Sequence, residues 1–536
     1  MKRKLSLLLS LALIASFLVP GLFVSAAGED WLASWANRIK ITIDKDQIDA
    51  TLTHFPVLIY LSAASGIGDV DVSCVFDELT SDANRKKIAV TKADGTTELY
   101  VEIEKWDDAN EKAWLHASLA AWEISSSVDT VLYLYYDSTH ADNDDYVGDT
   151  NSVVAESVWD SNFKAVYHMA DGASTFAIYD STGNDNDGAK GGAAAPAVTT
   201  SGKVGDAQDF EKSSSQNIIL TTLPLHADDT DTEFTVESCI NAESNTGTDA
   251  HIISHLNEGI FVFRLNSAAK ATLGIEQATS GWKFIETASA LTVDSSAWYH
   301  LASTWKKNDY VRLYKNSVAE TAVATANEFL KKGTDRASIG VFEHGSLNYF
   351  FDGIIDEVRI SNTARSAAWI AATYASLWDA LVTFGAEEVL WVSPTGFVDP
   401  DTAWTNEANA YDEDTATKAT GTGSDLELSH AELNCDKVRV WASFFRDNIP
   451  QEEDYTITLD VYYSSDWHNI VTNEEHTKGQ WEEISLGSTV AITAARLSMW
   501  SAIGGFESDR VYLYEFDFHE TAAPTGFAHS FGVIIF

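Results

Sequence analysis

Cysteine, methionine and proline are scarce in this sequence of 536 residues, which contains 3, 3 and 8 of them. Cys74, Cys239 and Cys435 lie far apart in the chain, so they do not form the framework of a disulfide-rich domain. No cysteine lies near a histidine at the spacing of a zinc finger. We therefore expect three buried small side chains, and the low proline content excludes a mucin-like stalk.

Basic residues are also few. The 35 Lys and Arg face 80 Asp and Glu, which gives a formal net charge of -45. So acidic a surface repels phosphate backbones, and nucleic acid is therefore excluded as an expected partner. Self-repulsion of this size is relieved by bound divalent cations or by high salt, and adaptation to a saline habitat remains the alternative explanation.

Long apolar runs are absent after the first thirty residues. The basic residues Lys2 to Lys4, the apolar run Leu5–Val19 and the small residues Val24 to Ala26 follow the order of a secretory signal. The run is short for a bilayer span and is followed by Pro20 and Gly21. We expect a signal peptide over residues 1–26 and a secreted, extracellular or cell-surface protein, with a retained anchor helix as the alternative.

Aromatic residues are plentiful at 11%, and short alternating apolar runs recur between Gly, Asn, Asp and Ser. This pattern is typical of half-buried strands, and the clearest helical segment is 367–381. Composition changes around 138–150 and 385–400. The sequence therefore predicts an all-β chain of three tandem β-sandwich or jelly-roll domains after the signal helix. The expected boundaries are 31–150, 160–385 and 390–520, followed by an apolar C-terminal strand over 521–536.

The middle region carries several separated motifs in a fixed order. They are Ala165-Val166-Tyr167-His168-Met169, Asp180-Ser181-Thr182-Gly183-Asn184, Trp298-Tyr299-His300-Leu301-Ala302 and Asp356-Glu357-Val358-Arg359-Ile360. In this order they resemble a laminin-G-like domain of the concanavalin A-like jelly-roll superfamily. The resemblance implies a structural calcium ion with Asp356 as one ligand. The alternative is that Asp356 pairs with Arg359 or caps a turn.

The first region resembles a β-sandwich family of unknown function that often precedes laminin-G-like domains in secreted and phage proteins. The motifs are Trp35-Ala36-Asn37-Arg38, Phe55-Pro56-Val57-Leu58, Tyr100 to Trp106 and Leu132 to Tyr136. Within it we expect an ion pair between strands that joins Arg38 to Glu102 or Glu104.

The last region resembles discoidin domains, which are galactose-binding-like jelly rolls. The resemblance rests on the segments Ala410 to Thr417 and Val511 to Phe516. It implies a calcium ion held by the opening loop and a late glutamate, with the ligands Asp412, Asp414, Thr417 and Glu515. Glu413 stands where the family usually has glycine, which is a departure in the loop.

Two further side chains are candidates for ligand binding. Trp467 and His468 follow Ser464 on a predicted loop, where exposed rings could stack on sugars. The alternative is that both rings are packed.

No catalytic motif is found. The sequence lacks G-x-S-x-G, H-E-x-x-H, P-loop and Rossmann glycine patterns. Jelly-roll glycosidases of the concanavalin type place acid and nucleophile as alternating carboxylates on one strand, whereas segments 260–265 and 284–287 offer only Glu286. A lone carboxylate cannot serve as both groups, so we expect no catalytic residues and no enzyme activity.

These observations predict an extracellular carbohydrate- or surface-binding adhesion protein that is stabilised by calcium and binds glycans or cell-surface polymers. A structural subunit of a virion fibre, an extracellular filament or a surface layer is the alternative. It rests on Phe527–Phe536, an uncharged apolar segment suited to self-association. A polysaccharide-degrading enzyme is the third and weakest hypothesis.

Overall fold

The computed structural model describes residues 31–32, 35–171, 177–191, 195–220, 225, 232–245, 247–255, 261–331, 336–343, 346–412, 414–446, 449–501 and 510–520. The expected signal peptide at 1–26 and the C-terminal strand at 521–536 lie outside these residues. In the part that the structure describes, no helix is both long and apolar enough to cross a membrane.

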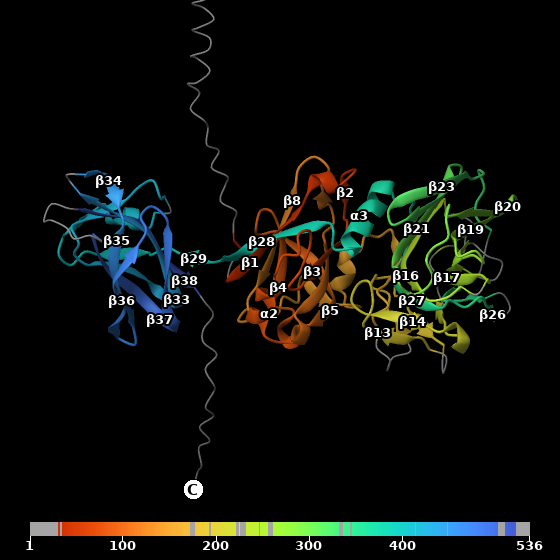
Figure 1. Ribbon diagram of the computed structural model, residues 1–536, viewed down its shortest axis with the longest axis horizontal. Helices are drawn as coiled ribbons and strands as arrows, with labels where there is room; N and C mark the ends of the chain where they lie inside the picture. The colour runs from red at the N-terminus through yellow and green to blue at the C-terminus, as the bar shows by residue number, and fades with distance from the viewer. Residues whose placement is uncertain are drawn as a thin grey trace, which may run out of the picture.

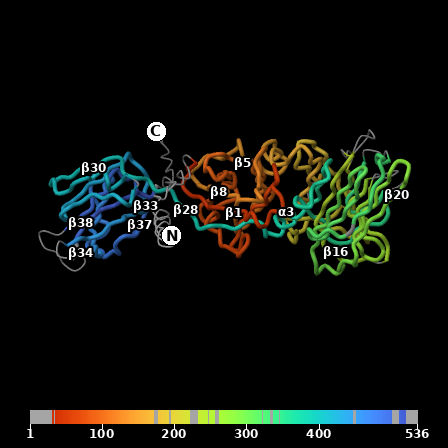
Figure 2. Tube along the Cα trace, turned by 90° about the horizontal axis from the view of Figure 1, so that it is seen from above, coloured from red at the N-terminus to blue at the C-terminus, as the bar shows by residue number. Residues whose placement is uncertain are grey.

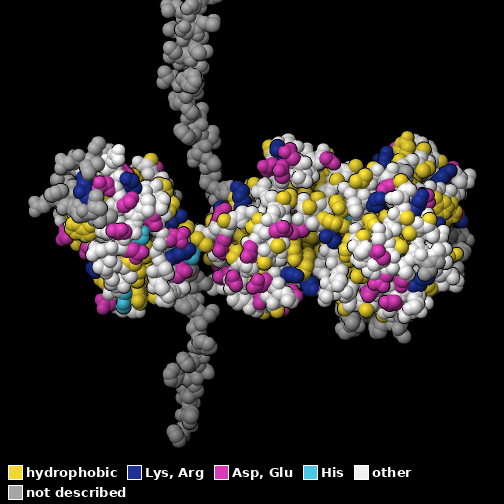
Figure 3. Space-filling view, viewed as in Figure 1, with side chains coloured by type: hydrophobic (Ala, Val, Ile, Leu, Met, Phe, Trp, Pro, Cys, Tyr) yellow, Lys and Arg dark blue, Asp and Glu magenta, His cyan; other side chains and the backbone are white. Residues whose placement is uncertain are grey.

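The predicted all-β class is confirmed, because antiparallel sheets make up almost all of the regular structure. Three lobes lie in a row, and the lobe built from the start of the chain is in the middle (Figures 1 and 2). We call them the first module, the jelly roll and the C-terminal module. Acidic side chains are spread over the visible face of all three lobes (Figure 3).

The first module contains an eight-stranded sheet with the order β28-β1-β8-β4-β5-β6-β3, and β9 pairs with β5. Its strands are β1 (Asn37–Ile43), β3 (Val57–Leu61), β4 (Ile88–Lys92), β5 (Glu98–Asp107), β6 (Lys112–Ser118), β8 (Thr130–Tyr136), β9 (Val147–Asp149) and β28 (Val382–Val389). The short helix α2 (Cys74–Leu79) packs beside it, and β2 (Leu52–Thr53) pairs with β7 (Glu123–Ile124).

Strand β28 follows the jelly roll in the sequence, although it belongs to the sheet of the first module. It pairs with β1 from Ile43 opposite Val382 to Asn37 opposite Val389. The expected domain boundary at residue 385 therefore falls inside a strand of the first module's sheet. The jelly roll is inserted in the chain between β9 and β28, which explains why the first module occupies the middle of the row.

The jelly roll consists of two eight-stranded sheets. One has the order β13-β14-β27-β16-β21-β22-β23 with β10 on β27, and the other has the order β11-β12-β15-β24-β17-β18-β19-β20. Large apolar side chains such as Phe234, Phe261 and Trp305 belong to one buried cluster of this module.

The strands of the jelly roll are β10 (Phe163–Tyr167), β11 (Ala177–Ile178), β12 (Gly188–Lys190), β13 (Ala197–Thr199), β14 (Ala207–Phe210), β15 (Ile218–Leu220), β16 (Glu233–Ala242), β17 (Ala250–His255), β18 (Phe261–Leu265), β19 (Ala271–Gln277), β20 (Gly281–Glu286), β21 (Tyr299–Lys306), β22 (Tyr310–Lys315), β23 (Val318–Ala324), β24 (Ala337–Ile339) and β27 (Gly353–Ser361). A two-stranded sheet joins β25 (Phe342–Glu343) to β26 (Leu347–Asn348).

Helix α3 (Ala367–Leu377) follows the jelly roll, close to the predicted helical segment. It begins at the N-cap Ser366, whose hydroxyl accepts a hydrogen bond from the amide of Trp369. Its side chains join the core of the first module, where the ring of Trp369 lies 5.0 Å from that of Phe55. One continuous apolar cluster thus links the first module to the jelly roll and α3.

The C-terminal module is a ten-stranded antiparallel sheet with the order β31-β32-β38-β33-β37-β35-β36, to which β29, β30 and β34 are added. Its strands are β29 (Trp391–Val392), β30 (Gly396–Val398), β31 (Trp404–Thr405), β32 (Ala419–Gly421), β33 (Leu426–Arg446), β34 (Ile449–Glu453), β35 (Tyr455–Tyr463), β36 (Asp466–His476), β37 (Trp481–Ser501) and β38 (Arg510–Glu520). The resemblance of this region to discoidin domains stays a prediction.

The three cysteines are free, as expected. Cys239 and Cys435 are buried and Cys74 is half-buried. No disulfide therefore contributes to the described fold, which depends on its apolar cores.

Candidate functional site

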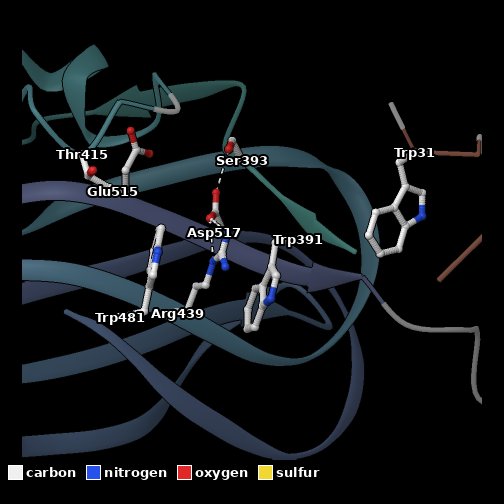
Figure 4. A pocket seen from close by; sticks show the side chains of 8 residues that line it. All are labelled: Trp31, Trp391, Ser393, Thr415, Arg439, Trp481, Glu515 and Asp517. Carbon is white, nitrogen blue, oxygen red and sulfur yellow. Dashed lines mark hydrogen bonds and ion pairs between the residues drawn. The ribbon is translucent and has the colours of Figure 1, made fainter. Parts of the chain in front are cut away.

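A cleft of about 440 Å³ opens on the C-terminal module. It is lined by Trp31, Trp391, Ser393, Thr415, Arg439, Trp481, Glu515 and Asp517 (Figure 4). Trp31 comes from the segment that precedes the first module, and the other seven side chains belong to the C-terminal module. Three indole rings, a guanidinium group and two carboxyl groups therefore line one concave surface.

Arg439 lies between the two tryptophans of the C-terminal module (Figure 4). Its guanidinium carbon lies 4.6 Å from the ring centroid of Trp391 and 3.9 Å from that of Trp481. Its Nε donates to Oδ2 of Asp517 at 2.8 Å, and the Ser393 hydroxyl donates to Oδ1 at 2.7 Å. We call Trp391, Arg439 and Trp481 the aromatic row.

The register of the sheet places the three side chains of the aromatic row next to one another. Arg439 on β33 is directly opposite Asp517 on β38, so both side chains project from the same face. On the other side β33 pairs with β37, which begins at Trp481. Trp391 on β29 is opposite His519, two residues beyond Asp517 on the same face of β38.

An acidic loop lies at the rim of the cleft. The amide of Asp414 donates to Glu515 Oε1 at 2.7 Å and to Asp412 Oδ1 at 3.1 Å. The Thr417 hydroxyl donates to Asp412 Oδ2 at 2.7 Å. The four residues that the discoidin resemblance implied as calcium ligands are thus brought together, although whether they bind calcium stays a prediction.

Glu515 is almost fully buried at the base of this loop, with 2% of its surface exposed. Burial, together with a hydrogen bond shared with Asp412, raises the pKa of Glu515 to about 8. At neutral pH this carboxyl group therefore holds a proton that a bound cation would displace.

Asp356 is fully buried on β27. Its Oδ2 accepts hydrogen bonds from the amides of Lys203 and Val204 at 2.7 and 3.0 Å, and Oδ1 has no hydrogen-bond partner. Burial and the neighbouring Glu357 carboxylate raise the pKa of Asp356 well above its usual value. Arg359 hydrogen-bonds to Glu357, and the role of Asp356 as a calcium ligand stays a prediction.

The expected position of Trp467 and His468 on an exposed loop is wrong. The turn is confined to Ser464 and Ser465, and both aromatic residues lie on strand β36 with half-buried side chains. Trp467 packs edge-on against Tyr462 at 5.3 Å between centroids, and His468 stacks on Tyr463 at 3.8 Å.

Two exposed rings on the jelly roll were not predicted from the sequence. Trp282 and Phe284 on β20 are 38% and 50% exposed, and their nearly parallel rings lie 5.5 Å apart. Gly274 on β19 leaves room for the ring of Phe284, because a Cβ there would lie 2.4 Å from it. The alternation of Trp282, Phe284 and Glu286 was the signal that these side chains share the outer face.

The expected ion pair between Arg38 and Glu102 or Glu104 is also wrong. Arg38 pairs with Glu388 of β28 at 2.7 Å, a partner that becomes available only because β28 joins β1. Glu102 and Glu104 instead point away from the core of the first module toward the jelly roll, where they lie near His168.

Comparison with known proteins identifies the middle of the chain. Residues 213–371 match the family model described as the concanavalin A-like lectin/glucanases superfamily. This part of the chain is a concanavalin A-like jelly roll. The resemblance stated for the middle region is thereby confirmed.

Several solved structures are similar to parts of this chain. Domain 4 of the GH43 extracellular arabinanase AbnA from Geobacillus stearothermophilus, in complex with arabinotriose, is 21% identical over 39% of this chain and 97% of its own, with a TM-score of 0.31. The CBM40 of the Ruminococcus gnavus IT-sialidase, bound to α2,3-sialyllactose, is 16% identical over 27% and 84% of the two chains, with a TM-score of 0.25. No curated protein matches the sequence.

Proposed function

We propose that this protein binds carbohydrates outside the cell through the cleft of the C-terminal module. The observation that carries the proposal is the aromatic row beside Asp517 in an open cleft of about 440 Å³. Flat apolar rings next to a few polar groups are the usual composition of a small-ligand site.

The chemistry of the row suits a sugar. The C–H face of a pyranose ring stacks on an indole, while its hydroxyl groups need donors and acceptors in the plane of the ring. Arg439 offers N–H donors and Asp517 offers carboxylate acceptors between the two tryptophans. A hydroxyl pair could therefore bind to the Arg439–Asp517 pair while the ring stacks on Trp391 or Trp481.

The jelly roll supports the same class of ligand. Its family is described as containing lectins and glucanases, and Trp282 and Phe284 expose a second aromatic surface. We place the primary site in the cleft because a concave surface buries more of a ligand than an exposed strand does. The strand β20 surface is the second place where a glycan would bind.

We also propose that the acidic loop binds a calcium ion. The loop of Asp412, Asp414 and Thr417 with Glu515 provides carboxylate and hydroxyl oxygens, which hard cations prefer. Since Thr415 and Glu515 also line the cleft, a calcium ion there would order the rim of the glycan site. A role in adhesion and a location at the cell surface follow from extracellular glycan binding and are part of the proposal.

In this proposal the protein binds glycans without hydrolysing them. Support comes from the cleft, where Glu515 and Asp517 are the lining carboxyl groups and Asp517 is engaged by Arg439 and Ser393. The alternative of a filament or virion fibre depends on the segment 521–536, which the structure does not describe, and it stays a prediction from sequence.

Calorimetric titration with the oligosaccharides that the wild type binds tests the location of the site. Trp481→Ala removes one ring of the row, and we expect at least a tenfold loss of affinity because an aromatic anchor in a cleft carries much of the binding energy. Trp282→Ala tests the second aromatic surface on β20, and it should reduce the affinity less than Trp481→Ala does. Loss of affinity in Trp282→Ala alone would place the glycan site on the jelly roll. Full affinity in both variants would overturn the assignment of either surface.

A further inference from the structure

A cluster of ionisable side chains lies between the first module and the jelly roll, far in sequence from the cleft. The first module contributes Glu102 and Glu104 from β5 and His116 from β6, which is directly opposite Glu102. The neighbours Val101 and Ile103 enter the apolar core of the module, so the alternating glutamates face the other way. None of the three polar side chains has any exposed surface.

The jelly roll contributes His168, which follows β10, and Glu357 on β27. A β-bulge interrupts β27 where it pairs with β16, and Glu357 adopts a left-handed backbone with φ of 49°. Ile355 and Val358 both enter the jelly-roll core, so Asp356 and Glu357 together occupy the interval that regular alternation would give to one residue. The bulge therefore directs Glu357 out of the jelly roll toward the first module.

Four of these side chains meet at one point. One ligand atom from each of Glu104, His116, His168 and Glu357 can be chosen so that all four lie within 4.8 Å of one another. The separations are 3.0 Å from His116 Nε2 to Glu104 Oε2, 3.3 Å from His168 Nδ1 to the same oxygen, and 2.5 Å from His168 Nδ1 to Glu357 Oε1. Tetrahedral zinc ligands lie about 3.4 Å apart, so small outward movements would make room for an ion.

The cluster contains buried polar atoms without hydrogen-bond partners. They include Glu104 Oε1 and His116 Nδ1, in side chains with no exposed surface. Leaving such atoms unpaired away from water costs about 1–3 kcal/mol each, and more for charged groups. The convergence of the four side chains, rather than these two atoms, indicates a site for an additional group.

We propose that Glu104, His116, His168 and Glu357 bind a divalent transition-metal ion, best matched by Zn²⁺, that fastens the first module to the jelly roll. Two imidazoles and two carboxylates form a donor set that suits zinc, whereas calcium and magnesium prefer oxygen ligands alone. Each module supplies one histidine and one glutamate. With four protein ligands that are almost completely buried, the proposed site is structural.

Neighbouring side chains position two of the four ligands, His168 and Glu357. Glu102 Oε1 lies 3.4 Å from His168 Nε2, so a carboxylate backs the imidazole whose Nδ1 faces the proposed ion. Glu102 is held in turn by the indole N–H of Trp159 at 2.7 Å. On the other side Arg359 Nε donates to Glu357 Oε2 at 2.9 Å and leaves Oε1 directed toward His168.

Burial and an excess of carboxylates determine the electrostatics of the cluster. Burial opposes a charge on His168, but the carboxylates of Glu357, Glu104 and Glu102 outweigh it and raise the pKa of His168 well above its usual value. Burial also raises the pKa of Glu104.

Metal analysis of the intact purified protein tests this proposal. After dialysis, the wild type should retain about one zinc per chain, and chelation should lower its melting temperature until zinc is restored. Cobalt should give the intense visible absorption of a tetrahedral complex. His116→Gln and His168→Gln should lose all three responses. His251→Gln, which alters a buried histidine elsewhere in the jelly roll, is the matched control and should keep them.

The outcomes distinguish this site from calcium bound to the acidic loop. Glu515→Gln should leave the zinc response unchanged, and calcium should not replace zinc. A wild type that retains no zinc and melts at the same temperature with zinc and with chelator would overturn the proposal. Retention of the tetrahedral cobalt spectrum in a folded His116→Gln or His168→Gln protein would do so as well.

Discussion

At the residue scale, local sequence anticipated the acidic loop but not the buried cluster. Asp412, Asp414 and Thr417 lie within one loop, and the sheet brings Glu515 to it. In the cluster, by contrast, Glu104 and Glu357 are separated by more than two hundred residues of chain. Their meeting depends on a bulge in β27 and on the docking of two modules, neither of which has a local sequence signature.

Asp160 and Arg365 form a bidentate ion pair at the junction of the same two modules, with both N–O distances at 2.7 Å. Burial alone would raise the pKa of Asp160, but the hydrogen bonds and charge of Arg365 outweigh it and hold the pKa below its usual value. Removing one partner of such a buried pair costs about 3–5 kcal/mol. We expect Asp160→Asn to lower the free energy of unfolding by that order at pH 7.

The pH dependence provides the check on this ion pair. Because the folded pKa of Asp160 is depressed, its stabilisation is present above the unfolded pKa of about 3.9 and is lost as pH falls through the folded pKa. The free energies of unfolding of the wild type and Asp160→Asn, measured in urea, should differ by a constant amount near neutral pH. The difference should be smaller below about pH 4. A difference that stays the same at pH 3 would contradict the ion-pair explanation.

At the scale of elements, strand β28 changes where the first module ends. It pairs along the whole of β1 and buries Val382 and Phe384, with 1% and 8% of their surfaces exposed. The composition change near residue 385 predicted a boundary, but pairing between segments so far apart in sequence leaves no local pattern. Strand and helix types, in contrast, depend on local periodicity, so the all-β class and the helix beginning at Ala367 could be predicted.

A fragment of residues 31–150 should therefore be unstable by itself. Without β28, strand β1 becomes an open edge, and the apolar cluster that includes Phe55 and Trp369 is divided. A fragment of residues 31–389 keeps β28 and α3 and should unfold cooperatively in circular dichroism. Cooperative unfolding of 31–150 at a similar temperature would show that β28 is dispensable.

The acidic loop gives a second prediction at this scale. A cation that binds only the folded protein stabilises it by about 2.7 kcal/mol at a hundredfold excess over its dissociation constant. Calcium should raise the melting temperature of the wild type held in excess zinc, and Glu515→Gln should reduce this shift. Equal melting temperatures with calcium and with a calcium-selective chelator would refute the calcium site.

At the scale of the whole molecule, the interface between the first module and the jelly roll is distinct from the cleft on the C-terminal module. The first module and the jelly roll share an apolar core and the buried cluster, whereas the cleft lies on the C-terminal module with Trp31 opposite (Figures 1 and 4). The aromatic row was missed in the sequence because Trp391, Arg439 and Trp481 come from three strands whose register only the fold provides.

The protein should not degrade the glycans that it binds. Asp517 is engaged by Arg439, and Glu515 is buried beneath the acidic loop. Incubation with bound polysaccharides should release no reducing ends above a heat-treated sample. If the wild type releases reducing ends and replacement of Glu515 or Asp517 abolishes this release, the protein is a glycosidase.

A glycan array probed with the intact protein in the presence of calcium and zinc is the sharpest test of carbohydrate binding. We predict binding to a limited set of glycans, and loss of that binding in a folded Trp481→Ala protein. A folded wild type that binds no glycan above background would contradict the proposed function.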